Sequence, residues 1–116
     1  MENDSAFLLS GNTYAIAADT SAPNGVQIGG PSTGGLISVL LYNSSSTDVV
    51  AVAWAATAGQ AQTNAVLPTA GNPSAAGVMV MAPQEKGSYT APPGQYWSAA
   101  SVSGPTTVYA MTGYGI

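Results

Sequence analysis

The sequence contains no cysteine and no histidine, and Lys86 is its single basic residue. Without cysteine there are no disulfides and no thiol nucleophile, and without histidine there is no imidazole base or Ser-His-Asp triad. Zinc sites built on His or Cys are excluded as well. One cation also argues against nucleic acids and anionic membranes as partners, because both are bound by clusters of Lys and Arg.

Charge of either sign is scarce. Charged side chains are 5% of the 116 residues, against about 25% in an average soluble domain. Interface cores are depleted in charge, so this composition favours a surface that is uncharged polar, covered by partners, or both. The charged residues are Glu2, Asp4, Asp19, Asp48, Glu85 and Lys86, with a net charge of −4.

Long hydrophobic runs are also missing. No apolar run reaches the roughly 18 residues that a membrane-spanning helix needs. The acidic start MENDSAF lacks the basic and apolar regions of a signal peptide. We therefore expect a chain that is made in a cytoplasm and has no membrane partner.

Turn residues and short β-prone segments dominate what is present. There are 14 Gly and 8 Pro, and 46% of the residues are apolar. Short segments rich in Val, Ile, Tyr and Thr between turn signals are typical of a β-sandwich or barrel. We predict one all-β domain over residues 1–116, a jelly roll or Greek-key β-sandwich of about eight short strands. The expected strands span residues 5–9, 13–18, 26–28, 36–42, 49–55, 77–81, 88–91, 95–101 and 106–111.

The connections between these strands carry further expectations. Strands 36–42 and 49–55 are predicted to form a hairpin, and so are 95–101 and 106–111. Strand 77–81 is apolar on both faces, which favours a central or covered strand over an exposed edge. Residues 29–35, 55–64 and 67–74 are expected to be loops, the last because prolines interrupt pairing.

Chemistry-bearing residues are few. Asp19, Asp48 and Glu85 are far apart in sequence and are interpreted as solvated turn residues. No calcium-loop or phosphate-loop pattern is present. We predict no catalytic residues, no metal and no cofactor, and hence no enzyme. The alternative is a carboxylate hydrolase in which two of these three acids converge within about 5–10 Å.

Aromatic residues are the remaining candidates, because Tyr and Trp are enriched at interface hot spots. Tyr96 and Trp97 are adjacent, so a strand points them to opposite faces. Trp54, Tyr96 and Trp97 also allow a second interpretation as a sugar-stacking platform. The candidate protein-interface residues are Trp54, Tyr96, Trp97, Tyr109, Tyr114 and Ile116.

Several turn patterns resemble small proteins of tailed bacteriophages. They are SAFLLSGNT at 5–13, VLPTAGNP at 66–73, AP-x4-SYT at 82–90, GQYWSAASVSG at 94–104 and TVYAMTGYGI at 107–116. The resemblance is to capsid decoration, or cement, proteins, which are often trimers of a β-sandwich or jelly roll. Relatives often carry an acidic residue where this chain has Tyr114.

The resemblance implies a structural virion protein on the capsid surface that stabilises a phage head by packing on capsid subunits. Its expected partners are the major capsid protein and itself, as a homotrimer. The alternative function is a head- or tail-fibre module that recognises host-surface glycans.

Overall fold

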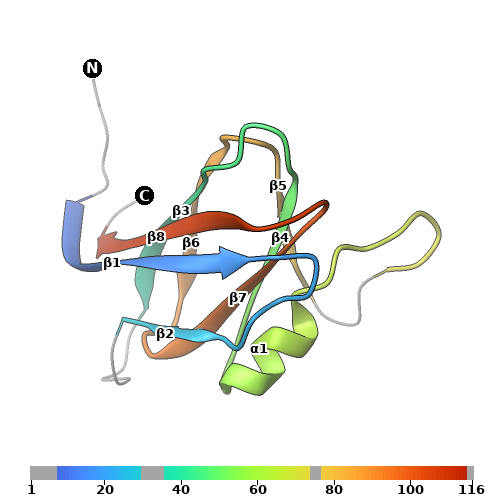
Figure 1. Cartoon of the computed structure of the whole chain (residues 1–116). Helices are drawn as coiled ribbons and strands as arrows, with labels where there is room; N and C mark the ends of the chain where they lie inside the picture. The colour runs from blue at the N-terminus through green and yellow to red at the C-terminus, as the bar shows by residue number, and fades with distance from the viewer. Residues whose placement is uncertain (1–7, 30–35, 74–76, 115–116) are drawn as a thin grey trace.

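The computed structural model describes residues 8–29, 36–73 and 77–114, and within them it contains eight strands and one short helix (Figure 1). The elements are β1 (Leu8–Ala18), β2 (Val26–Ile28), β3 (Ile37–Asn43), β4 (Val50–Ala55), α1 (Ala58–Asn64), β5 (Met79–Met81), β6 (Lys86–Ala91), β7 (Gln95–Ser101) and β8 (Thr106–Tyr114).

The strands form two four-stranded antiparallel sheets. Sheet I has the order β1-β8-β3-β6, and sheet II has the order β2-β7-β4-β5. The pairs β1·β8, β2·β7, β3·β6 and β4·β5 are those of one long hairpin with its turn between β4 and β5. The additional pairs β3·β8 and β4·β7 roll this hairpin into two layers. This is the jelly-roll arrangement, and it confirms the all-β sandwich prediction.

The first two expected strands are one strand in the structure. β1 runs through Ser10–Asn12, where a turn was expected, and the register against β8 shifts between Leu9 and Thr13. A bulge of this kind bends a strand without ending it, so the glycine signal marks an irregularity instead of a loop. Residues 5–7 of the expected first strand lie outside the described part.

The two expected hairpins are wrong. β3 belongs to sheet I and β4 to sheet II, and β7 and β8 are divided in the same way. The chain crosses between the sheets after Asn43, whose side-chain amide donates to the carbonyls of Asp48 (2.8 Å) and Ala82 (3.0 Å). These bonds hold the crossing loop against the β5–β6 turn. A tight hairpin turn between β3 and β4 would not bring Asn43 to these two carbonyls.

Strand β5 also differs from the expectation. It pairs with β4 and is an edge strand of sheet II, and it covers only Met79–Met81. Met81 is fully buried in the core, whereas Val80 is 51% exposed. An apolar strand at a sheet edge is tolerated here because it is only three residues long. Residues 67–73 carry no strand, as their prolines predict.

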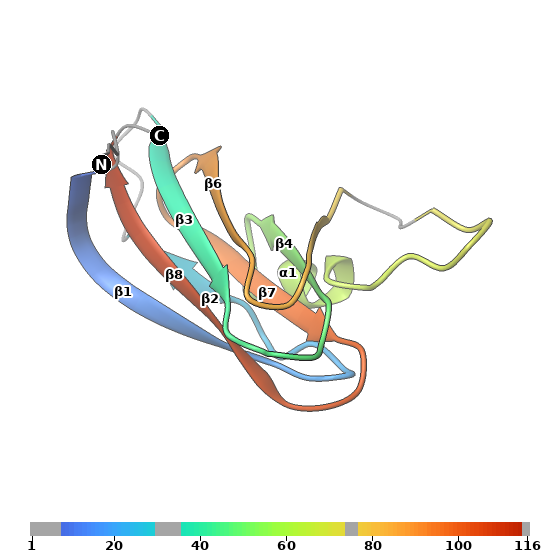
Figure 2. The ribbon, with the colours of Figure 1, turned by 90° about the horizontal axis from the view of Figure 1, so that it is seen from above.

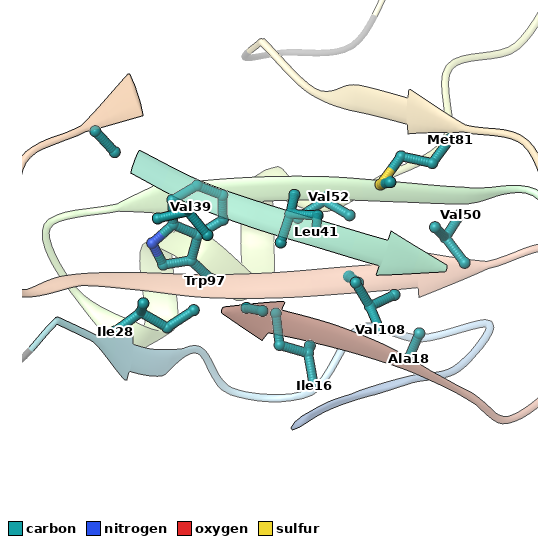
Figure 3. Packing of buried hydrophobic residues seen from close by; sticks show 13 residues of the cluster. Ile16, Ala18, Ile28, Val39, Leu41, Val50, Val52, Met81, Trp97 and Val108 are labelled. Carbon is teal, nitrogen blue, oxygen red and sulfur yellow. The ribbon is translucent and has the colours of Figure 1, made fainter. Parts of the chain in front are cut away.

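One apolar layer between the sheets forms the core (Figure 3). Strand alternation turns Ile16, Val39 and Val108 of sheet I toward Val52 and Trp97 of sheet II. Trp97 is the largest of the fully buried side chains. Its indole fills the space between β7 and β3 in Figure 3.

Helix α1 covers the outer face of sheet II, and its presence corrects the loop expected over residues 55–64. Thr57 caps the helix by accepting a bond from the Gln60 amide at 3.2 Å. Small side chains allow the close packing, with Ala61 fully buried. A second apolar cluster under the helix consists of Ala22, Ala53, Ala65 and Ala100. The helix has no clear apolar periodicity because its one buried residue is an alanine, Ala61.

We expect Trp97→Ala to lower the free energy of unfolding by about 3–5 kcal/mol, because it leaves a large cavity in the core. Val102→Ala is the control: Val102 is 58% exposed, and its change should stay within about 0.5 kcal/mol. Chemical denaturation of both variants measures the difference. A Trp97→Ala protein as stable as the control would contradict this packing.

Candidate interaction surface

The outer face of sheet I is the broad strand surface that no described element covers. Helix α1 contacts β4 and β7 of sheet II, on the other side of the sandwich. In Figure 2, β1, β8 and β3 run side by side along one side of the molecule. Alternation and register place the following side chains on this face: Thr13, Ala15, Ala17, Ser38, Leu40, Tyr42, Lys86, Ser88, Thr90, Thr107, Tyr109 and Met111.

Tyr109 lies at the centre of this face. It is 40% exposed, and the register places it between Ala15 of β1 and Tyr42 of β3. Leu40 pairs with Met111 two residues further along the same strands, and both are half-buried although no described element covers them. Neighbouring side chains therefore shield one another within the face. The result is an apolar and aromatic patch on two central strands.

Charge is nearly absent from this face. Among the described residues the charged side chains are Asp19, Asp48, Glu85 and Lys86, and of these Lys86 lies on the face, at the β6 edge. Its ammonium nitrogen is 5.7 Å from the centre of the Tyr42 ring. A cation at this distance is attracted to the ring's negative face. The single charge of this surface is thus already associated with one of its aromatic residues.

The described acidic residues accept hydrogen bonds from loop residues. Asp48 is 9% exposed, and its carboxylate accepts bonds from the Ser103 hydroxyl (2.7 Å) and amide (3.3 Å). The fully buried Asn43 adds its bonds to Asp48 and Ala82. Together these contacts tie the β3–β4, β5–β6 and β7–β8 connections at one end of the sandwich.

These hydrogen bonds change the acidity of Asp48. The Ser103 hydroxyl is the largest influence, and with the Ser103 amide and Thr47 it lowers the pKa of Asp48 below its ordinary value of 3.8, against an opposing effect of burial. A lowered pKa favours the ionised carboxylate, which suits a permanent acceptor. The other two acids are engaged elsewhere: Asp19 accepts from the Thr20 amide and Glu85 from the Ala82 amide.

The sequence-predicted site residues do not gather in one place. Trp97 is 1% exposed and belongs to the core, so it is removed from the interface candidates. Tyr96 points to the opposite face of β7, as its position next to Trp97 predicts, and is half-exposed near Gly25. Tyr109 is exposed on sheet I. The Tyr114 side chain and Ile116 lie outside the described part.

Trp54 lies at the rim of the core. It pairs in register with Trp97, and the ring centres are 6.1 Å apart. The pairing of β5 with β4 extends only as far as Val52, so β5 does not lie beside Trp54, and the indole is 37% exposed. A hollow of about 440 Å³ beside it is lined by Asn64, Gly77, Val78 and Met79. The three aromatics of the expected sugar platform are therefore divided between the rim, the core and the outer face of sheet II.

We also searched the described part of the chain for a metal site and for a membrane-spanning helix. Residues 8–29, 36–73 and 77–114 contain no group of three or more Asp or Glu placed to hold a metal ion. Within the same ranges, no helix has the length and apolar character needed to cross a bilayer. Comparisons with protein-family models, curated proteins and solved structures gave no match to this chain.

Sequence reasoning found Tyr109 but missed its neighbours Leu40, Tyr42 and Met111. Each of them lies in an apolar strand in which the sequence does not distinguish the core face from the outer face. The signal that separates the faces is the register, because Tyr42 and Tyr109 are opposite each other on one side of sheet I. Register across strands distant in sequence is not readable from a single chain.

We expect the stability that Asp48 provides to be complete at neutral pH and to be lost as the pH falls. Its folded pKa is below 3.8, so protonation below that value removes the acceptor and favours unfolding. Asp48→Asn should reduce the stability at pH 7 and flatten its fall below about pH 4. Urea unfolding at several pH values measures this.

Asp19→Asn is the matched control for that prediction, because Asp19 is exposed and accepts a local bond from the adjacent Thr20 amide. It should keep the parent protein's pH dependence. If Asp48→Asn and Asp19→Asn gave the same curve, the Ser103 contacts would not be the source of the acid sensitivity.

Proposed function

We propose that this protein is a structural virion protein, a decoration protein that packs on the shell of a tailed-phage head. The observation that carries the proposal is the apolar and aromatic patch at the centre of the outer face of sheet I, where charge is nearly absent. Interface cores have this composition. Tyr109 is the central anchor, with Tyr42, Leu40 and Met111 around it.

The mechanism is adhesion. A face of four strands about 4.8 Å apart and six residues long covers roughly 400 Å² in projection. A standard stable interface buries about 800 Å² on each partner. One face is therefore a weak contact, and affinity comes from repetition: many copies bound around a shell, with neighbouring copies holding one another. The major capsid protein and further copies of the chain are the partners.

The jelly roll is compatible with this role and does not decide it. The fold occurs in viral capsid domains and also in lectins, and a fold hosts many functions. The argument for shell binding comes from the side chains of sheet I, together with the turn patterns that resemble decoration proteins.

A glycan-binding module is the second candidate function. The observation that favours it is Trp54, an exposed indole beside a hollow that also presents the Asn64 amide. Sugar rings stack on such side chains. A titration with host-surface glycans that quenches Trp fluorescence, and that Trp54→Ala abolishes, would support this candidate over the first.

We expect Tyr109→Ser to weaken binding to shells of the encoding phage at least about tenfold, because truncating a central aromatic anchor removes a hot spot. Because Tyr109 is exposed in the free chain, the variant should remain folded. Co-sedimentation with purified shells measures binding. Thermal rupture of shells with and without the bound protein measures stabilisation.

Val102→Ser is the control for this experiment. Val102 is also exposed, but it lines a hollow beside α1 with Gln62 and Val66, on the covered side of the molecule. It should bind shells like the parent protein. Equal rupture temperatures with and without the protein, or equal losses from both variants, would reject the proposal.

A further inference from the structure

The four edges of the two sheets are protected to different degrees. Edge strands β2 and β5 of sheet II are three residues long each, and β6 of sheet I carries Lys86. Short strands and edge lysines are two devices by which proteins prevent edge pairing. Strand β1, the other edge of sheet I, is 11 residues long and contains no charged residue and no proline.

The second half of β1 is the unprotected part. A register shift between Leu9 and Thr13 disturbs its first half. From Thr13 to Ala18 the pairing with β8 is continuous, and β8 is the single strand paired with β1 in the described part of the chain. Every second backbone amide and carbonyl of this stretch therefore points to the open side.

We infer that β1 is a self-association edge, on which β1 of a second copy pairs in the antiparallel direction about a two-fold axis. An antiparallel pair of identical strands is self-complementary, so one surface suffices for both partners. The exposed side chains of the stretch are Thr13, Ala15 and Ala17, all small, so nothing bulky holds the second strand away.

Charge supports a copy of the same chain as the occupant. Identical chains place identical charges near a two-fold axis, and such pairs usually repel. Here the nearest charge is Asp19, one residue beyond the strand. In a ladder centred on Ile16, the two Asp19 residues are about 20 Å apart along the strands. That exceeds the screening length of about 8–10 Å at moderate salt.

The inferred pairing has a consequence for the outer face of sheet I. A two-fold axis perpendicular to the sheet keeps both outer faces on the same side, so two copies present one eight-stranded surface. Its projected area of roughly 800 Å² equals one side of a standard interface. The pairing itself stands independently of shell binding, because it depends on β1 alone.

The resemblance to decoration proteins implies trimers, and the inferred edge pairing gives dimers instead. A ladder this short buries less surface than a stable interface, so we expect reversible dimers that form between about 10 µM and 1 mM. Sedimentation over this range distinguishes monomer, dimer and trimer. Hydrogen exchange adds a direct measurement: protection of those amides of residues 13–18 that point to the open side should rise with protein concentration, and that of β6 should not.

Paired charge variants test the interface itself. Ala15→Lys/Ala17→Lys places like charges opposite one another across the axis and should raise the dissociation constant at least about tenfold, as should Ala15→Glu/Ala17→Glu. Both positions are exposed, so the monomer should stay folded. An equal mixture of the two variants should form dimers again, which a misfolded chain would not do.

The control is Ser88→Lys, which adds one lysine to the same face at the opposite edge, β6. It should dimerise like the parent chain. A monomer at 1 mM, a trimer, or a dimer that Ser88→Lys or Tyr109→Ser disrupts as strongly as the β1 variants would overturn the inference.

Discussion

The apolar layer between the two sheets is the interaction on which the rest of the molecule depends. Strand alternation points four large side chains into this layer: Ile16, Val39, Val108 and Trp97. Their orientation determines which face of the sheet every other strand residue lies on. Once one side of each strand is committed to the core, the opposite side must face α1 or solvent. The outer face of sheet II is covered by helix α1, which packs on alanines. The outer face of sheet I carries Tyr109, Tyr42 and Met111.

The fold class and most strand positions could be predicted from the sequence, because alternation and turn residues are local signals. Strands β2 and β7 match their expected bounds. Strand pairing could not be predicted in the same way. β3 and β4 are adjacent in sequence and apolar, yet they lie in different sheets, and the loop that crosses between them is held by the buried Asn43. The helix was missed because alanines and one glycine show no periodicity. Trp97 was misplaced because core and interface both select large aromatics.

The surface illustrates the same limit. Scarcity of charge predicted a surface that is uncharged or covered, and among the described residues Lys86 is the one charged residue on the outer face of sheet I. Which flank this is depends on register and on where α1 lies, and both arise from contacts between residues far apart in the chain. The acids are likewise explained by position: Asp48 orders a loop through Ser103, a contact 55 residues away in sequence.

The pairing of β1 with β8 joins the first and the last described strands of the chain. During synthesis β1 leaves the ribosome well before β8, and it lacks its partner strand until residues 106–114 follow it. Sheet I therefore closes only when residues 106–114 are available, and contacts this distant in sequence make folding slow. Until that moment a nascent chain exposes both edges of β1. Neighbouring nascent chains on one messenger RNA can therefore pair with the edge of β1 that β8 occupies in the folded protein.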